Sequence, residues 1–218
     1  MNGAIGDDMV MIRHKVQLAT DELATTLPKK IIFLGDSITD GIGLSSPLTQ
    51  SYPSQLALLL TGTLWSVENY GITSTTILKQ GSPSYWDSKE FAQAKNSEPN
   101  IVVIFLGLND IKPKNWKYKE QFISNYSSLI NIFLGLTSQP KIFLVLPTPS
   151  FGTLEGITDT KITNELIPRI NQIASLYNIE VIDLHSYFVD KSYLFPDTIH
   201  PNKDGAKIIA QIVHGKIF

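Results

Sequence analysis

Residues 31–41 read Ile31-Ile32-Phe33-Leu34-Gly35-Asp36-Ser37-Ile38-Thr39-Asp40-Gly41. The apolar part of this stretch is typical of a strand that is covered on both faces, as strands of a parallel sheet are. Gly35 and the polar residues after it predict a turn at the carboxyl end of that strand. Ligands of open α/β sheets bind beyond the carboxyl ends of the strands. The polar turn is therefore the first place to look for chemistry.

Apolar strands and amphipathic helices alternate through the rest of the chain. The sequence predicts strands over residues 31–35, 64–70, 101–106, 141–146 and 179–184. Apolar spacing of three and four predicts helices over 10–27, 53–60, 119–136 and 162–177, and a last helix that Asn202 caps. Pro168 has to kink or restart the helix in which it lies. This alternation predicts an α/β fold with one five-stranded parallel sheet and helices on both faces. We expect a tail and helix over 1–29 and one domain over 30–218.

Composition excludes several classes of protein. The chain has 218 residues, no cysteine and a net charge of −2. Without cysteine there is no disulfide framework, cysteine nucleophile or iron–sulfur site, and without a basic surplus we expect no nucleic-acid partner. No His or carboxylate cluster has metal-ligand spacing, so we expect neither a metal nor a cofactor.

The chain shows no targeting or membrane signal. No apolar run reaches the roughly 18 residues of a membrane span, and the N-terminus lacks a basic start and an apolar stretch. We expect a soluble chain that is cytoplasmic by default, while export of a mature form whose signal has been removed stays open. The sequence does not give the oligomeric state.

Three further polar segments accompany the turn at Ser37. They are Asn69-Tyr70-Gly71, Gly107-Leu108-Asn109-Asp110 and Asp197-Thr198-Ile199-His200-Pro201. The first two follow predicted strands, so they meet the Ser37 turn at one edge of the sheet. The loop 185–200 can bring the last segment back to that edge.

The side chains in these segments suit nucleophilic catalysis. A serine hydroxyl is a weak nucleophile until a base takes its proton, and His200 is the natural base for Ser37. Asp197 can hold the imidazole in one tautomer. The oxyanion formed by attack on a carbonyl needs donors, which the N–H of Ser37, the N–H of Gly71 and the side-chain amide of Asn109 can supply.

Together the four segments resemble the SGNH hydrolases, also called GDSL esterases/lipases, across residues 30–218. The resemblance implies a flavodoxin-like three-layer α/β/α sandwich. It also implies that Ser37 is the nucleophile, His200 the base and Asp197 its orienting acid. Ser37, Gly71 and Asn109 would form the oxyanion hole. Ile38 stands where the family's nickname has leucine, at a position that packs rather than reacts.

The residues around these segments allow weaker expectations. Lys112-Pro113-Lys114-Asn115-Trp116 looks like the sialate O-acetylesterase-like and acetylxylan-esterase-like branch of the family. Flat aromatic faces suit sugar rings, so we expect Trp116 and Trp86 at the rim of the site as substrate contacts. His185 follows the fifth strand and is a further candidate contact. Asp36 and Asp110 are expected to brace loops.

These observations predict a serine ester hydrolase that removes short acyl groups, most simply acetyl, from a saccharide through an acyl-enzyme on Ser37. Its partner would be a small-molecule or saccharide ester. Three alternatives stay open. One is a non-catalytic sugar- or flavin-type binding module of the same fold, and another is a thioesterase or lysophospholipase-type acyl hydrolase. The third is a scaffold protein that docks through the helix over 10–27.

Overall fold

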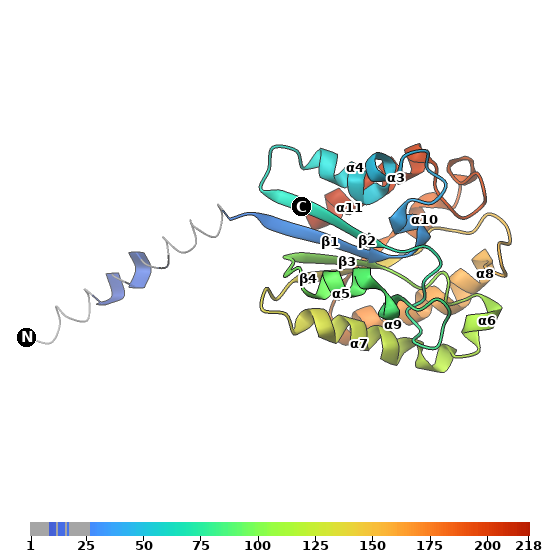
Figure 1. Ribbon diagram of the computed structural model, residues 1–218, viewed down its shortest axis with the longest axis horizontal. Coiled ribbons are helices and arrows are strands. Elements are labelled where there is room, and N and C mark those ends of the chain that lie inside the picture. The colour runs from blue at the N-terminus through green and yellow to red at the C-terminus, as the bar shows by residue number, and fades with distance from the viewer. Residues whose placement is uncertain (1–8, 12, 16, 18–26) are drawn as a thin grey trace, which may run out of the picture.

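The structure, a computed structural model, describes residues 9–11, 13–15, 17 and 27–218. A five-stranded sheet lies at its centre (Figure 1). The strands are β1 Lys29–Gly35, β2 Trp65–Gly71, β3 Ile101–Phe105, β4 Lys141–Leu146 and β5 Glu180–Asp183. Their order across the sheet is β2-β1-β3-β4-β5, and every neighbouring pair is parallel. The predicted α/β class and five-stranded parallel sheet are confirmed, and the strand order is the flavodoxin-like one.

Helices cover both faces of the sheet and complete three layers (Figure 1). One face carries α2 Ser37–Asp40, α3 Pro47–Gln50, α4 Tyr52–Leu59, α10 Leu184–Phe188 and α11 Lys203–Ile217. The other carries α5 Lys89–Lys95, α7 Phe122–Leu134 and α9 Ile167–Tyr177. The short helices α6 Pro113–Trp116 and α8 Asp159–Lys161 lie beyond the carboxyl ends of the strands.

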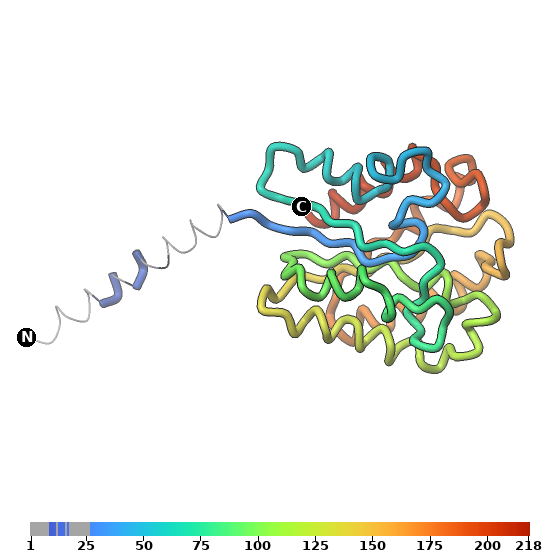
Figure 2. The backbone as a smooth tube through the Cα atoms, in the orientation of Figure 1, coloured from blue at the N-terminus to red at the C-terminus, as the bar shows by residue number. Residues whose placement is uncertain are grey.

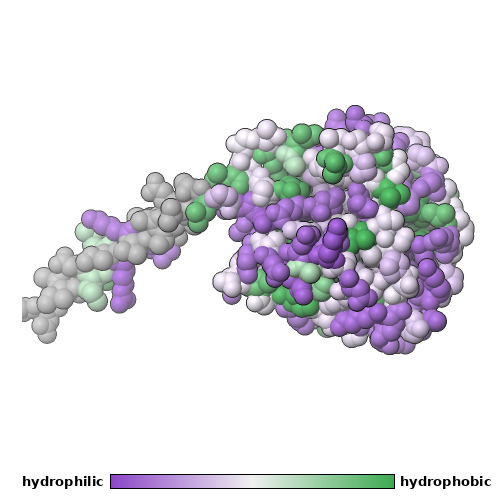
Figure 3. All heavy atoms as spheres, viewed as in Figure 1, coloured by the Kyte–Doolittle hydropathy of each residue, from purple (hydrophilic) through white to green (hydrophobic). Residues whose placement is uncertain are grey.

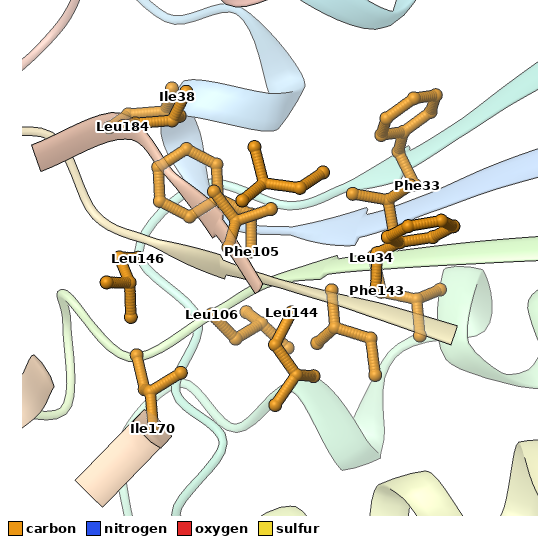
Figure 4. Packing of buried hydrophobic residues seen from close by; sticks show 14 of the residues in the cluster. Phe33, Leu34, Ile38, Phe105, Leu106, Phe143, Leu144, Leu146, Ile170 and Leu184 are labelled. Atoms are coloured by element: carbon orange, nitrogen blue, oxygen red, sulfur yellow. The ribbon is translucent and has the colours of Figure 1, made fainter. Parts of the chain in front are cut away.

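The core fills the space between the sheet and its two helical layers. Every residue of β3 is buried, as expected from its continuous apolar run. Figure 4 shows Ile38 and Leu184 on one side of the sheet and Ile170 on the other. These three side chains are at most 2% exposed, so the sheet is covered on both faces.

The strand β2 lies at one edge of the sheet, and β5 lies at the other. Five of the seven residues of β2 are half-buried and two, Ser66 and Asn69, are exposed, so none is fully buried. An edge strand has only one strand neighbour, so polar side chains such as Glu68 are tolerated there.

Local residues decide where the last helix begins and how the helix around Pro168 runs. Asn202 Oδ1 accepts from the N–H of Gly205 at 2.9 Å and so begins α11, which confirms the predicted cap. Pro168 is the second residue of α9 and follows a turn of π-helix at Ile162–Leu166, which runs into α9 without a break. The helix predicted over 10–27 lies largely outside the described residues.

The C-terminal helix α11 packs against α4, which follows β1 in the chain. The trace in Figure 2 brings the red C-terminal segment beside the light-blue segment that follows β1. The side-chain amide of Gln55 in α4 donates to the carbonyl of Lys203 in α11 at 3.1 Å, across 148 positions.

On the face drawn in Figure 3, apolar residues form separate small groups among polar ones. No helix in the described part of the chain is long and apolar enough to cross a membrane.

Candidate active site

Strand β1 delivers Ser37 to the carboxyl edge of the sheet. Ser37 is the first residue of α2, and Asp36 caps this short helix by accepting from the N–H of Ile38 at 3.2 Å. The residue is 8% exposed, so its hydroxyl is held in a buried turn that solvent still reaches.

His200 lies directly against this serine. Its Nε2 is 2.8 Å from Ser37 Oγ, and its Nδ1 is 2.6 Å from Oδ2 of Asp197. The other oxygen of Asp197 accepts from the backbone N–H groups of Ile199 and His200 at 3.1 and 2.7 Å. The three side chains therefore form one hydrogen-bonded chain from hydroxyl to imidazole to carboxylate.

The carboxylate end of this chain is held in its ionised form. Burial on its own raises the pKa of Asp197, but the hydrogen bonds from His200 and Ile199 outweigh burial and leave that pKa below its ordinary value. The turn between acid and base contains Thr198 at φ 77°, and its carbonyl accepts from the N–H of Phe151 at 2.9 Å. The loop after β4 thus holds the turn that sets the His200 ring.

Asn109 reaches the same place from β3. It is 5% exposed, and its side-chain amide donates to Oδ2 of Asp36 at 3.3 Å. Burial raises the pKa of Asp36 to about 6, against the hydrogen bond from the N–H of Ile38 and the electrostatic interactions with His200 and Lys112. Asp36 therefore braces both the serine turn and Asn109.

Asp110 is fully buried and bonds to backbone, as predicted. Its two oxygens accept from the N–H groups of Ile77 and Leu78 at 3.1 and 2.7 Å. Burial raises its pKa to about 8, although these two hydrogen bonds oppose the shift. The contact fixes the loop after β2 against the end of β3.

A cavity of about 160 Å³ opens above these groups. Its lining residues come from the loops at the carboxyl ends of the strands. They are Ser37, Ile42, Thr73, Ser74, Leu108, Asn109, Lys112, Leu154, Glu155, Ile157, Ile199 and His200. Three of the predicted residues therefore line one cavity, namely Ser37, Asn109 and His200. Asp197 does not line it but contacts His200.

Gly71, which the sequence predicted as an oxyanion donor, does not line this cavity. Its N–H donates to Oδ1 of Asn69 at 2.9 Å, so it already has an acceptor. A Cβ at this position would collide with the backbone of Thr39 and Asp40, which explains the glycine. Ser74, three residues later, lines the cavity instead, with φ 67°. No acceptor in the described part of the chain contacts its N–H.

The two tryptophans are structural rather than exposed at a rim. Trp116 is 7% exposed, its Nε1 donates to Glu165 at 2.6 Å, and Arg169 lies over its ring. Trp86 donates from Nε1 to the carbonyl of Ile77 at 2.7 Å. Neither tryptophan lines the cavity. Each indole N–H instead donates to a residue elsewhere in the chain.

His185 is also placed outside the cavity. Its Nε2 lies 2.9 Å from Oδ1 of Asp159, and its side chain is 12% exposed. The same oxygen of Asp159 accepts from the N–H of Ser150 at 3.2 Å. The histidine therefore joins α10 to α8 and, through Asp159, to the loop after β4, and it does not line the cavity.

The sequence interpretation missed Ser74, Lys112 and Glu155. A serine with positive φ has no sequence signature, and the sequence pointed to Gly71 in the same loop because a glycine allows close approach of the backbone. Lys112 lies in the segment that the sequence singled out for Trp116. Lys112 follows soon after the predicted strand 101–106, and this position was the signal that it lies at the same edge of the sheet as Ser37.

Residues 33–208 match the sequence profile of the GDSL-like Lipase/Acylhydrolase family. The chain belongs to this family. The matched range contains the Ser37, Asn109, Asp197 and His200 segments. The match to the GDSL-like family thus covers nearly all of the α/β/α sandwich, as the resemblance of these segments implied.

A relative in sequence supports the membership. The chain is 34% identical over 206 residues to an acetylxylan esterase of Xylanibacter ruminicola, with 86% of this chain matched. The match spans only 43% of that esterase, so this GDSL-like chain covers less than half of its relative.

Solved structures share the fold. The crystal structure of an acetyl xylan esterase, AlAXEase, superposes with a TM-score of 0.69 at 22% identity, covering 87% of this chain and 100% of that one. A two-domain esterase active on acetylated mannans superposes with a TM-score of 0.67 at 21% identity, covering 92% of this chain and 51% of that one. The three-layer α/β/α sandwich is confirmed by these superpositions.

Proposed function

We propose that this chain is a serine ester hydrolase that removes acetyl groups from a saccharide. The observation that carries the proposal is the hydrogen-bonded chain Ser37–His200–Asp197, whose serine opens into a small cavity. The family name supports acyl hydrolysis, and the names of the relatives support an acetylated saccharide as the substrate.

Acylation begins at the contact between Ser37 and His200. Nε2 of His200 takes the hydroxyl proton while Oγ attacks the acetyl carbonyl carbon, and the carbonyl electrons move onto oxygen. The C–O bond to the sugar then breaks, and the leaving oxygen takes the proton from the imidazolium. Asp197 stabilises that imidazolium through the 2.6 Å contact with Nδ1. Water repeats the sequence on the acetyl-serine and releases acetate.

The oxyanion is stabilised by three donors in this proposal. They are the backbone N–H groups of Ser37 and Ser74 and the side-chain amide of Asn109. Ser74 takes the place first expected for Gly71, because it lines the cavity and Gly71 donates to Asn69. Donors that are already fixed act without reorganisation when the charge develops.

The experiment compares wild type with Ser37→Ala and His200→Ala. Both variants are expected to lower kcat for p-nitrophenyl acetate and for an acetylated xylo-oligosaccharide by roughly 10⁴-fold or more. Ser124→Ala, at an exposed serine of α7, is the matched control and keeps wild-type turnover. Binding of the oligosaccharide without release of acetate by wild type would contradict the proposal and favour the binding module.

A further inference from the structure

A second cavity adjoins the one that contains Ser37. It has a volume of about 350 Å³ and is lined by Lys112, Pro113, Lys114 and Glu155. Lys112 and Glu155 also line the first cavity, so the two spaces share a wall. A substrate whose ester group reaches Ser37 therefore has its neighbouring atoms near this second space.

The charges of the second cavity are unequal. Lys112 forms an ion pair with Glu155, and Lys114 adds a second positive charge. The hydrogen bond from Lys112, followed by the charges of Lys112 and Lys114, lowers the pKa of Glu155, so its carboxylate stays ionised. In the lining of the second cavity, two lysines stand against one glutamate, which leaves an excess of positive charge there. Asp36, whose pKa the Lys112 charge lowers, is buried and does not line this cavity.

The two members of the ion pair differ in how firmly they are held. The Lys112 side chain is 10% exposed, and its carbonyl accepts from the N–H groups of Asn115 and Trp116, both at 2.9 Å. Asn115 in turn donates to the carbonyl of Asn109 at 2.8 Å, and Trp116 is anchored on Glu165. The segment that carries Lys112 is therefore fixed against the catalytic residues.

Glu155 is the exposed partner. Its side chain is 62% exposed on the loop after β4, where its backbone has φ 51°. A buried ammonium needs a counter-charge, but an exposed carboxylate loses little when it returns to water. A second carboxylate can therefore replace Glu155 without leaving Lys112 unpaired.

We propose that Lys112 and Lys114 form a subsite for the carboxylate of a uronic acid unit in the substrate, and that Glu155 pairs with Lys112 when the subsite is empty. This inference rests on the proposed function. An acetyl group carries no charge, so the carboxylate has to belong to the sugar. Lys112 is then a specificity-determining residue, since it distinguishes acidic from neutral acetylated sugars.

The experiment uses two matched compounds, the acetylated methyl glycoside of a uronic acid and its uncharged carboxamide. The measured quantity is the ratio of kcat/KM for the acid to kcat/KM for the amide. Wild type is expected to favour the acid by about tenfold, the range of a hydrogen bond to a charged group. Lys112→Met should bring the ratio to about one, and Lys114→Gln, an exposed position, should lower it several-fold.

Glu155→Gln supplies the decisive comparison, because it breaks the same ion pair from the other side. It should raise the ratio, since it removes the carboxylate that competes with the substrate. A merely structural ion pair would make both variants change the ratio in the same direction, and that result would overturn the subsite. Lys117→Gln, an exposed lysine outside both cavities, is the control and should keep the wild-type ratio.

The failures of the two proposals can be told apart. A ratio near one in wild type, with both compounds hydrolysed, would overturn the subsite and leave saccharide deacetylation standing. Hydrolysis of neither compound by an enzyme that turns over p-nitrophenyl acetate would overturn the saccharide part of the proposed function, and the subsite with it.

Discussion

The side-chain amide of Asn109 donates to Oδ2 of Asp36 over 3.3 Å, and both residues are buried. The other oxygen of Asp36 accepts from the N–H of Ile38 and so begins the helix that presents Ser37. One carboxyl group thus positions the end of β1 and the end of β3 relative to each other. Removing it should disturb the nucleophile and the proposed oxyanion donor together.

Asn109→Ala is expected to lower kcat by about 10² to 10³ with little change in KM, because its hydrogen bond strengthens only as the oxyanion forms. Asp36→Asn should lower kcat less, by about tenfold, since Asn109 keeps its amide but loses the acceptor that orients it. Steady-state kinetics with p-nitrophenyl acetate separate the two parameters. A raised KM with an unchanged kcat would make Asn109 a ground-state binder.

The raised pKa of Asp36 predicts a specific dependence of stability on pH. The carboxyl titrates near 3.8 when unfolded and near 6 when folded, so between these values the folded state holds the extra proton. Its contribution to the free energy of unfolding is then largest below about pH 4, falls as pH rises to about 6, and is level above that. The whole change is on the order of 3 kcal/mol.

Urea unfolding of wild type and Asp36→Asn at several pH values measures this change. The stability of wild type relative to the variant should fall from pH 4 to pH 6 and then stay constant. A difference that is independent of pH would show that the carboxyl is not shifted upward by burial.

The positive φ of Ser74 makes its backbone N–H testable by substitution. Ser74→Gly should keep kcat close to wild type, because glycine adopts this conformation and retains the N–H. Ser74→Val should lower kcat by at least about tenfold, since a β-branched residue there forces the backbone to shift and one oxyanion donor is worth 10² to 10³. Gln139→Val, at another positive φ far from the cavity, is the control for backbone strain. It should lower stability and leave kcat unchanged, and equal losses of kcat in both valine variants would contradict the donor role.

The size of the cavity predicts a preference for short acyl groups. A cavity of about 160 Å³ suits an acetyl group better than an extended chain. A long acyl chain gains about 0.8 kcal/mol per buried methylene only where an apolar channel receives it. We expect kcat/KM to fall from p-nitrophenyl acetate to butyrate to octanoate. A steady rise towards octanoate would point to a lipase or long-chain thioesterase.

Much of the fold follows from local sequence. The apolar run of Ile101 to Phe105 predicts a strand buried on both faces, and capping by Asn202 predicts where the last helix begins. The boundaries of β2 were one residue off, because an edge strand mixes polar and apolar residues and its ends are set by pairing with β1.

The candidate site could be predicted only in part. Ser37, Asn109, Asp197 and His200 carry side-chain chemistry, and their places after strands or before the last helix can be read from sequence. The role of Ser74 depends on a backbone dihedral, which the residue type does not encode. The tryptophans were misplaced because aromatic residues suit both sugar faces and cores, and only the partners of their N–H groups decide between the two.

Ser37 and His200 meet across 163 positions of the chain. Such a contact has a high entropic cost of loop closure, so it forms late compared with local helices. Refolding should therefore restore helical ellipticity before it restores turnover. On the ribosome, where synthesis runs at about 5–20 residues per second, the emerging domain can bury its first strands long before residues 197–200 exist. Newly made molecules would thus stay without esterase activity until the segment carrying His200 has emerged and docked.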